Sequence, residues 1–262
     1  MKTIFLLRNA TAGVGIGALL LGLDAPAEAQ DEGVLNADGW RFGVTPYVWL
    51  AGLKGDVGTF PRLPLASVDV GFDDIIENTD IALMLAAEAR KDRFGIVADL
   101  SYLSVSADGD VPGPLFGGAG VDTRTFFGTV AGLYRVVNTD TVDVDLGAGT
   151  RIWYVDTEVN FDAGLLPGRS FEADQVWADP IVGVRLNIEL GRDFSFAAAG
   201  DVGGFGLASD LTWQLLGTVD YRFNDWFSVR AGYRHLAVDY ENDGFVWDVD
   251  LSGPIVGATF RF

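Results

Sequence analysis

Apolar residues occupy every second position over long stretches of this chain. The last stretch shows the pattern most clearly, with apolar side chains at Pro254, Val256, Ala258, Phe260 and Phe262 separated by Ile255, Gly257, Thr259 and Arg261. Similar alternation runs through 142–154 and 175–190. This period places one continuous apolar stripe on one face of a β-strand. Stripes of about 12–14 residues exceed an ordinary strand and match a tilted bilayer crossing.

The alternation predicts ten strands. They cover 40–53, 79–90, 93–106, 121–135, 142–157, 175–190, 193–204, 211–223, 226–240 and 247–262. The connections 91–92, 136–141, 191–192 and 224–225 are tight, whereas 54–78, 107–120, 158–174, 205–210 and 241–246 are mostly longer. Short turns at one end and longer loops at the other are typical of an outer-membrane barrel. We therefore predict an all-β, closed, antiparallel transmembrane barrel in an up-and-down meander. Eight strands remain the alternative if 193–223 does not form two full spans.

Three positions fit the pattern less well. Pro46 and Pro180 lie inside predicted strands, and proline removes a hydrogen-bond donor from the ladder. We expect a local bulge at each. The inward and outward faces of 121–135 stay undecided, because Phe126 and Phe127 are adjacent and must point to opposite sides.

The N-terminus has the pattern of a secretory signal peptide. Lys2 and Arg8 precede an uncharged run from Asn9 to Leu23, and small residues surround a cleavage point after Ala29. The uncharged run is shorter than a membrane-spanning helix requires, which disfavours the alternative of an uncleaved anchor. We expect a signal peptide at 1–29, a short periplasmic segment at 30–39 and the barrel at 40–262.

Composition narrows the class of protein. The 262 residues carry a net charge of −19, which argues against nucleic-acid binding. There are no cysteines and one histidine, so disulfides, thiolate sites and a pair of histidine ligands are excluded. Hydrophobic residues make up 49% of the chain, although no charge-free stretch after residue 29 is long enough for a helical span. We predict no cofactor and no resident metal.

Aromatic residues on the apolar stripes collect near the strand ends, as headgroup-level belts do. One belt comprises Trp40, Phe42, Phe94, Phe194, Tyr221, Phe223, Phe227, Phe260 and Phe262, and the other comprises Tyr102, Tyr154 and Trp213. The terminal Phe262, with Phe260 before it, resembles the C-terminal assembly signal of outer-membrane barrels. That resemblance implies recognition by the barrel-insertion machinery.

Three segments carry a more specific resemblance. They are WADPIVGVR at 177–185, GDVGGFGLASDLTWQ at 200–214 and AGYRHL at 231–236. They are similar to segments of uncharacterised proteobacterial outer-membrane barrel proteins, and the architecture resembles the small OmpA-like and OmpW-like barrels. The resemblance implies a Gram-negative outer membrane as location, with outer-membrane lipid and lipopolysaccharide as partners. It supplies no set of enzymatic residues.

The polar phase of the strands predicts a charged lumen. Its expected members are Arg41, Asp80, Glu88, Arg90, Asp99, Asp143, Asp145, Arg151, Asp179, Arg185, Glu189, Asp201, Asp220, Arg222, Arg230 and Arg234, with Tyr47, Arg93 and Arg261 on the same phase. Arginine forks bridge carboxylates on neighbouring strands in bidentate fashion. We interpret the set as an ion-pair network that fills the lumen, with a narrow mixed-charge pore as the alternative.

His235 is a separate candidate, because barrel enzymes use a histidine with an acid or a serine. Asp239 shares its face, and Ser252, Asp243 and Asp248 lie on the next hairpin. His235 falls on the outward phase, however, and Ala237 stands where a His-x-Ser arrangement needs serine. We therefore expect a structural histidine and no enzyme, with a membrane-embedded hydrolase around His235 as the second alternative.

The predicted outer loops are acidic, in 54–78 and 241–250 above all. They indicate a solvated surface, and the alternative is that these carboxylates share divalent cations with lipopolysaccharide. The preferred function is a non-enzymatic barrel, structural or at most a narrow, porin-like passive pore. The first alternative is surface binding or adhesion through the loops 54–78, 107–120 and 158–174.

Overall fold

The computed structural model describes residues 39–58, 66–71, 79–109 and 115–262. The expected signal peptide and most of the segment 30–39 lie outside these residues, as do parts of the loops 54–78 and 107–120. The strands are β1 (Arg41–Trp49), β2 (Gly52–Gly58), β3 (Ala66–Val70), β4 (Thr79–Lys91), β5 (Phe94–Gly109), β6 (Phe116–Asn138), β7 (Val142–Ala163), β8 (Arg169–Glu189), β9 (Phe194–Gly203), β10 (Leu211–Arg222), β11 (Phe227–Asn242) and β12 (Phe245–Arg261).

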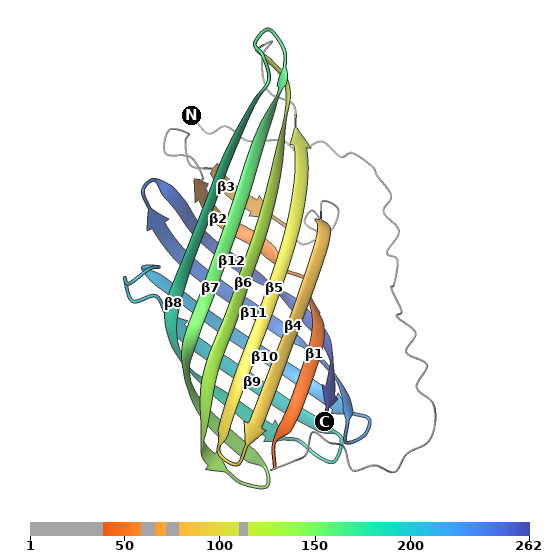
Figure 1. Cartoon of the computed structure of the whole chain (residues 1–262). Coiled ribbons are helices and arrows are strands. Elements are labelled where there is room, and N and C mark those ends of the chain that lie inside the picture. Colours follow the sequence, from red (N-terminus) through yellow and green to blue (C-terminus); the bar gives the residue numbers. More distant parts are fainter. Residues whose placement is uncertain (1–38, 59–65, 72–78, 110–114) are drawn as a thin grey trace.

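Ten of these strands form a closed antiparallel barrel (Figure 1). Strands β4 to β12 pair consecutively, and β1 closes the ring between β4 and β12. The closure is visible in the register pairs Arg41 with Arg90 and Gly43 with Arg261. Because β9 pairs with β10 along its whole length, the ten-strand prediction is confirmed and the eight-strand alternative is wrong.

The first barrel strand continues beyond the closed ring. After a break at 50–51, β2 pairs with the far half of β12 and with β3. Part of the predicted loop 54–78 is therefore sheet. The tight connections and the C-terminus lie at one end of the barrel, which we call the turn end, and the opposite end is the loop end.

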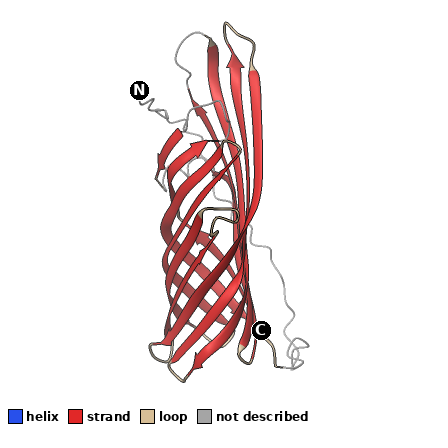
Figure 2. Ribbon diagram, turned by 90° about the vertical axis from the view of Figure 1, so that its left-hand side faces the viewer, coloured by secondary structure: helices blue, strands red, loops and turns tan. Residues whose placement is uncertain are grey.

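Strands β6, β7 and β8 are much longer than predicted. They stay paired beyond the rest of the barrel, with a register shift between Phe116 and Ala119, and stand above it as a projecting arm (Figure 2). Most of the predicted loop 158–174 is strand, and so are the described ends of 107–120. The predicted boundaries followed the apolar stripe, whereas backbone pairing continues after the stripe ends. The predicted loop 241–246 is a tight turn at Asp243–Gly244, both with positive φ, as a type I′ hairpin requires.

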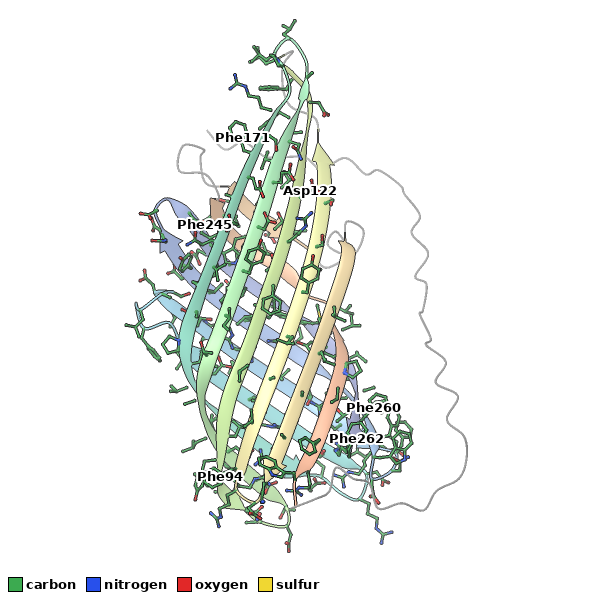
Figure 3. The ribbon with its side chains drawn as sticks, in the orientation of Figure 1. Phe94, Asp122, Phe171, Phe245, Phe260 and Phe262 are labelled. Carbon is green, nitrogen blue, oxygen red and sulfur yellow. The ribbon has the colours of Figure 1, made fainter. Side chains whose placement is uncertain are left out.

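Exposed apolar side chains cover the outside of every barrel strand. Examples from β1 and β4 to β12, each at least 46% exposed, are Val48, Leu83, Ile96, Val130, Leu146, Val182, Phe194, Leu215, Tyr233 and Val256. A soluble monomer rarely exposes so continuous an apolar surface. Aromatic rings gather outside the turn end, where Phe94, Phe260 and Phe262 lie (Figure 3). The described residues contain no helix long and apolar enough to cross a membrane.

The phase of β6 is settled by burial. Phe127 is 6% exposed and joins the buried core, so odd positions face the lumen and Phe126 faces outward. The register of β6 with β7 shifts between Arg135 and Val137. Arg135 therefore points into the lumen, although its phase could not be assigned from the sequence.

The expected bulges at the two prolines are wrong. The β1 registers with β4 and β12 are unshifted around Pro46, although the β12 ladder omits Thr45 and Pro46. Pro180 pairs in register with Thr150, and its carbonyl accepts a hydrogen bond from Gly204 N, just beyond the end of β9. The nitrogen of Pro180, which carries no hydrogen, therefore faces the end of β9. No ladder hydrogen bond is lost there, and no bulge is needed.

The inward and outward faces exchange polarity near the loop end. In the first half of β12, Phe245, Trp247, Val249 and Leu251 are buried inside, while Asp248 and Asp250 are exposed outside. In the second half, Val256 is exposed outside and Thr259 faces the lumen. The apolar outer belt thus ends near Ser252, and above it the barrel has an apolar core and a polar surface.

Candidate functional site: the barrel lumen

The lumen wall formed by β4, β6, β7 and β8 carries a closed ion-pair set, which we call the acid–arginine lattice. Its members are Glu88, Arg90, Arg135, Asp143, Asp145 and Arg185. Asp145 is fully buried and accepts two hydrogen bonds from Arg90, at 2.7 and 3.1 Å, and two from Arg135, at 2.9 and 3.4 Å. Arg185 reaches across to Glu88 at 2.6 Å. Each buried charge in the lattice has a partner, as burial requires.

A second group, the arginine wall, lies at the turn end on β1, β10, β11 and β12. It consists of Arg41, Arg222, Arg230 and Arg261. Arg230 binds Asp220 at 2.8 Å and Arg222 binds Glu189 at 3.2 Å. Within the described residues, Arg41 and Arg261 form no ion pair.

Between these two groups lies a cavity of about 470 Å³. Small side chains create the space, because Ala86, Ala131, Gly147, Gly183 and Ala199 line it where larger residues would fill it. Gly183 also allows close strand approach, since a Cβ there would collide with the Gly200 carbonyl and Asp201. The part of the lumen near the turn end is therefore a cavity with charged walls.

A buried charged layer crosses the lumen above the cavity. Arg151 is fully buried and binds Asp201 at 2.8 Å, Thr212 at 3.1 Å and Thr129 at 3.2 Å. Arg234 is 1% exposed and donates to Gln214 at 2.6 and 2.9 Å and to Tyr47 at 2.9 Å, with Asp99 at 3.4 Å.

The Asp99 and Tyr47 side chains complete this charged layer. The Tyr47 hydroxyl donates to Asp99 at 2.6 Å, and Gln214 Nε2 donates to Asp201 at 3.2 Å. The two arginines are thereby joined through Gln214 into one network across the barrel.

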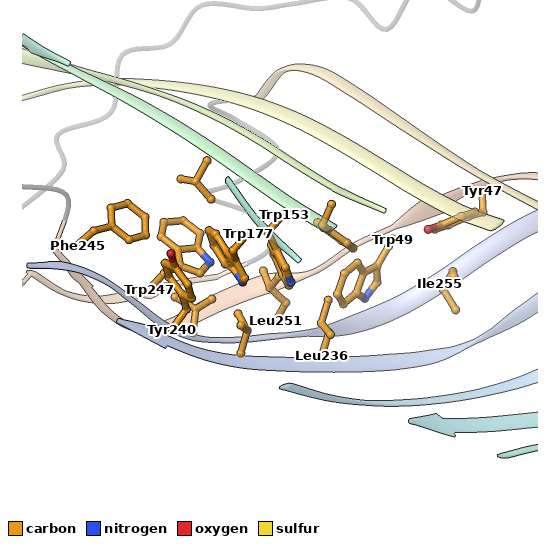
Figure 4. Close-up of a cluster of buried hydrophobic side chains, with 14 residues drawn as sticks. Tyr47, Trp49, Trp153, Trp177, Leu236, Tyr240, Phe245, Trp247, Leu251 and Ile255 are labelled. Carbon is orange, nitrogen blue, oxygen red and sulfur yellow. The ribbon is translucent and has the colours of Figure 1, made fainter. Parts of the chain in front are cut away.

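Aromatic side chains seal the lumen above the charged layer (Figure 4). This aromatic plug comprises Trp49, Phe127, Trp153, Trp177, Tyr240, Phe245 and Trp247, with Val155, Leu236 and Val238 packed around it. Trp177 stacks on Tyr240 at 4.0 Å between ring centroids and on Trp153 at 5.7 Å. Trp153, Val155 and Leu236 have no solvent-exposed surface. Solvent therefore does not reach these three side chains from either end of the barrel.

Besides Arg41 and Arg261, two further expected lumen residues differ from the prediction or lie outside the description. Asp179 points inward but pairs with no arginine among the described residues, and instead accepts hydrogen bonds from Ser209 N and Oγ, both at 2.8 Å. Ser209 also accepts from Trp177 Nε1 at 3.0 Å, so the β9–β10 loop supplies the partner. The side chain of Asp80 lies outside the described residues.

Sequence reasoning missed Arg135 and the aromatic plug. Arg135 was missed because the sequence did not decide which face of 121–135 points into the lumen. Large apolar residues on the same strand face as the charged residues indicated the plug. Trp153, two positions after Arg151, is an example. Glycines and charges elsewhere on the same phase obscured that signal.

His235 lies on the outer surface of β11, as its phase predicts. Its Nε2 is 3.3 Å from Asp250 Oδ1, and its ring packs against Trp213 at 4.5 Å between centroids. Ser252 is its direct cross-strand neighbour, but no hydrogen bond joins the two side chains within the described residues. The acid beside His235 is thus Asp250, not one of the three acids considered from the sequence.

Comparison with known proteins gives a structural likeness only. No family model and no curated protein sequence matches the chain. The crystal structure of the outer-membrane protease OmpT from Escherichia coli superposes with a TM-score of 0.51 at 10% identity, covering 86% of this chain and 98% of that one. The chain has the fold of the small outer-membrane β-barrels.

Other barrels match more loosely. Ail, the attachment invasion locus protein of Yersinia pestis, has a TM-score of 0.37 at 10% identity over 86% of this chain and 99% of that one. The toluene transporter TbuX of Ralstonia pickettii has a TM-score of 0.35 at 10% identity over 87% of this chain and 90% of that one.

Proposed function

We propose that the protein is a non-enzymatic integral barrel of a bacterial outer membrane, with a lumen that does not conduct. The continuous apolar exterior supports insertion, because a sheet in hydrocarbon must close on itself and turn apolar residues outward. The turn end then faces the periplasm and the projecting arm faces outward. Outer-membrane lipid and lipopolysaccharide are the proposed neighbours of the apolar belt.

The observation that carries the sealed lumen is the succession of two barriers. Arg151 and Arg234 fill one cross-section, and the aromatic plug fills the next. At the level of these two layers, the buried side chains of the barrel itself occupy the interior. The structural role is thus better supported than the passive pore.

Single-channel recording in a planar lipid bilayer tests this proposal. We expect no resolvable conductance steps from the refolded protein, while a general porin added to the same bilayer at the end shows that channels are detectable. A reproducible ohmic channel from the wild-type protein would refute the sealed lumen.

Surface binding is the second candidate, and the projecting arm favours it. The tip of the arm exposes Leu115, Leu165 and Phe171, and Phe116 packs on Phe161 there at 5.0 Å between centroids. Exposed apolar tips of this kind often mark interaction sites. Excision of 160–170 with an Asn-Gly turn would join the register pair Val159 and Phe171 and leave the barrel intact. Unchanged cell or ligand binding by this variant would argue against the 160–170 tip of the arm as a binding surface.

The non-enzymatic assignment is supported by the surroundings of His235. The imidazole is held between Trp213 and Asp250 on the outer face, and its Ser252 neighbour is not hydrogen-bonded to it. Loss of a lipid- or peptide-hydrolysing activity in His235→Ala, with retention in Asp225→Ala, would overturn this assignment. Sharing of divalent cations between the outward acids and lipopolysaccharide stays a prediction.

A further inference from the structure

Around the cavity, the lumen charges balance except at the arginine wall. The acid–arginine lattice has three arginines and three acids, and the charged layer above the cavity pairs Arg151 and Arg234 with Asp99 and Asp201. The arginine wall has four arginines, whereas Glu189 and Asp220 are its two acids. The excess positive charge is therefore concentrated at the turn end of the cavity.

Buried donors of the arginine wall are also left without partners. Arg261 Nη1 and Arg230 Nε are buried and make no hydrogen bond. A buried donor without an acceptor costs free energy, more so on a charged group. Guanidinium groups bind phosphate and carboxylate oxygens strongly through paired N–H donors. An anion placed between these side chains would satisfy both the charge and the donors.

The cavity next to the arginine wall is large enough and accessible. Its volume of about 470 Å³ falls within the range of small-molecule sites. The side chains of Arg222 and Glu189 are 39% and 43% exposed, so solvent reaches the wall from the turn end. The aromatic plug closes the other end.

We propose that this cavity is a blind binding site for a small multivalent anion bearing phosphate or carboxylate groups, with Arg222, Arg230, Arg261 and Arg41 as its ligands. The anion enters from the periplasmic side and does not cross the barrel. The arginines face the lumen, so the barrel wall separates them from the lipid, and the ligand is a free anion. This site adds a solute-binding role to the structural barrel and does not depend on conductance.

Isothermal titration with pyrophosphate as the probe tests the site. The full chain is folded in a neutral, phosphate-free detergent, and ionic strength is held constant with sodium chloride so that screening does not change during the titration. We expect saturable binding at one site. Arg261→Gln and Arg222→Gln should each weaken the affinity at least tenfold, and circular dichroism verifies that each variant keeps its β-sheet.

The matched control is Arg192→Gln, which removes the same charge from the exposed β8–β9 turn outside the cavity. It should change the affinity less than twofold. Absence of saturable binding by the wild-type protein overturns the proposal. Equal weakening in Arg192→Gln and the two cavity variants also overturns it, because that result reflects net charge alone.

Discussion

The guanidinium carbon of Arg234 lies 4.7 Å from the ring centroid of Trp49, at the junction between the charged layer and the aromatic plug. The same group lies 5.6 Å from the Phe127 ring. Cation–π contact of this kind is strongest where water is excluded, and the Arg234 side chain is 1% exposed. Arg234 thereby links the polar network below to the aromatic core above.

We predict that Arg234→Ala strongly destabilises the barrel. The change leaves Asp99, Gln214 and the Tyr47 hydroxyl without their shared donor, and breaking a buried ion pair costs about 3–5 kcal/mol. Denaturant unfolding in lipid vesicles, followed by tryptophan fluorescence, measures the free energy of unfolding.

The control for this prediction is Arg124→Ala. Arg124 pairs with Asp156 at 3.4 Å on the outside of the arm, and its side chain is 58% exposed. Such a pair contributes at most about 1 kcal/mol. Similar losses in the two variants would show that the buried network does not hold the lumen together.

Removal of one plug residue should also be costly. Trp153 is fully buried and packs against Phe127 at 4.8 Å and Trp177 at 5.7 Å between centroids. Trp153→Ala should lower the free energy of unfolding by about 3–5 kcal/mol through lost burial and the cavity left behind. Trp226→Ala, at a turn residue that is 57% exposed, should cost much less in the same unfolding assay. A small effect of Trp153→Ala would mean that the plug is loosely packed.

The aromatic plug could not be predicted from the alternation of apolar and polar residues. In β12 the apolar stripe runs outward through Val256 and Phe260, which predicts the lipid-facing side correctly. Nearer the loop end the apolar residues shift to Trp247 and Leu251 on the opposite phase. The strand alternates throughout, but its surroundings change from lipid to water. The outward face is therefore apolar in one half of the strand and polar in the other, and one rule for both halves fails.

The lumen shows a similar division. Alternation alone places Arg90, Asp145 and Arg185 inside, because each lies on the strand face opposite to the apolar stripe. Which partners they select depends on register between strands, and Asp179 shows this most clearly. Its partner Ser209 lies in the β9–β10 loop, which has no period to read.

The outward acids near the loop end predict a pH dependence of stability. Asp239 lies beyond the apolar belt, and partial burial together with Asp248, Asp210 and Glu241 raises its pKa above the ordinary value. The folded protein therefore binds this proton more tightly than the unfolded chain. Stability from this site is present below the ordinary carboxyl pKa and is lost as pH rises through the raised one.

Asp239→Asn should consequently be more stable than the wild type at neutral pH, with a weaker pH dependence of the free energy of unfolding. Urea titrations at several pH values between 4 and 8, on the order of one unit apart, measure both effects. Asp225→Asn, in the β10–β11 turn, removes an equal charge far from this cluster and should leave the pH dependence unchanged. A wild-type stability that rises with pH over this interval, and rises less in Asp239→Asn, would contradict the assignment.

Phe262 should matter more for assembly than for the folded barrel. Its backbone closes the ring, because Phe262 N donates to Phe42 O at 3.0 Å and Phe42 N donates to Phe262 O at 3.2 Å. Its side chain is 59% exposed and packs little.

Phe262→Ala keeps both hydrogen bonds, so refolding into detergent should give the wild-type circular dichroism spectrum and yield. The predicted recognition of the terminal aromatic by the barrel-insertion machinery implies that the same variant reaches the outer membrane several-fold less in cells. Phe223→Ala, equally exposed at 58%, serves as the matched control and should insert normally. Equal insertion of the two variants would remove the assembly role of Phe262, and failure of Phe262→Ala to refold in detergent would assign its side chain a structural role instead.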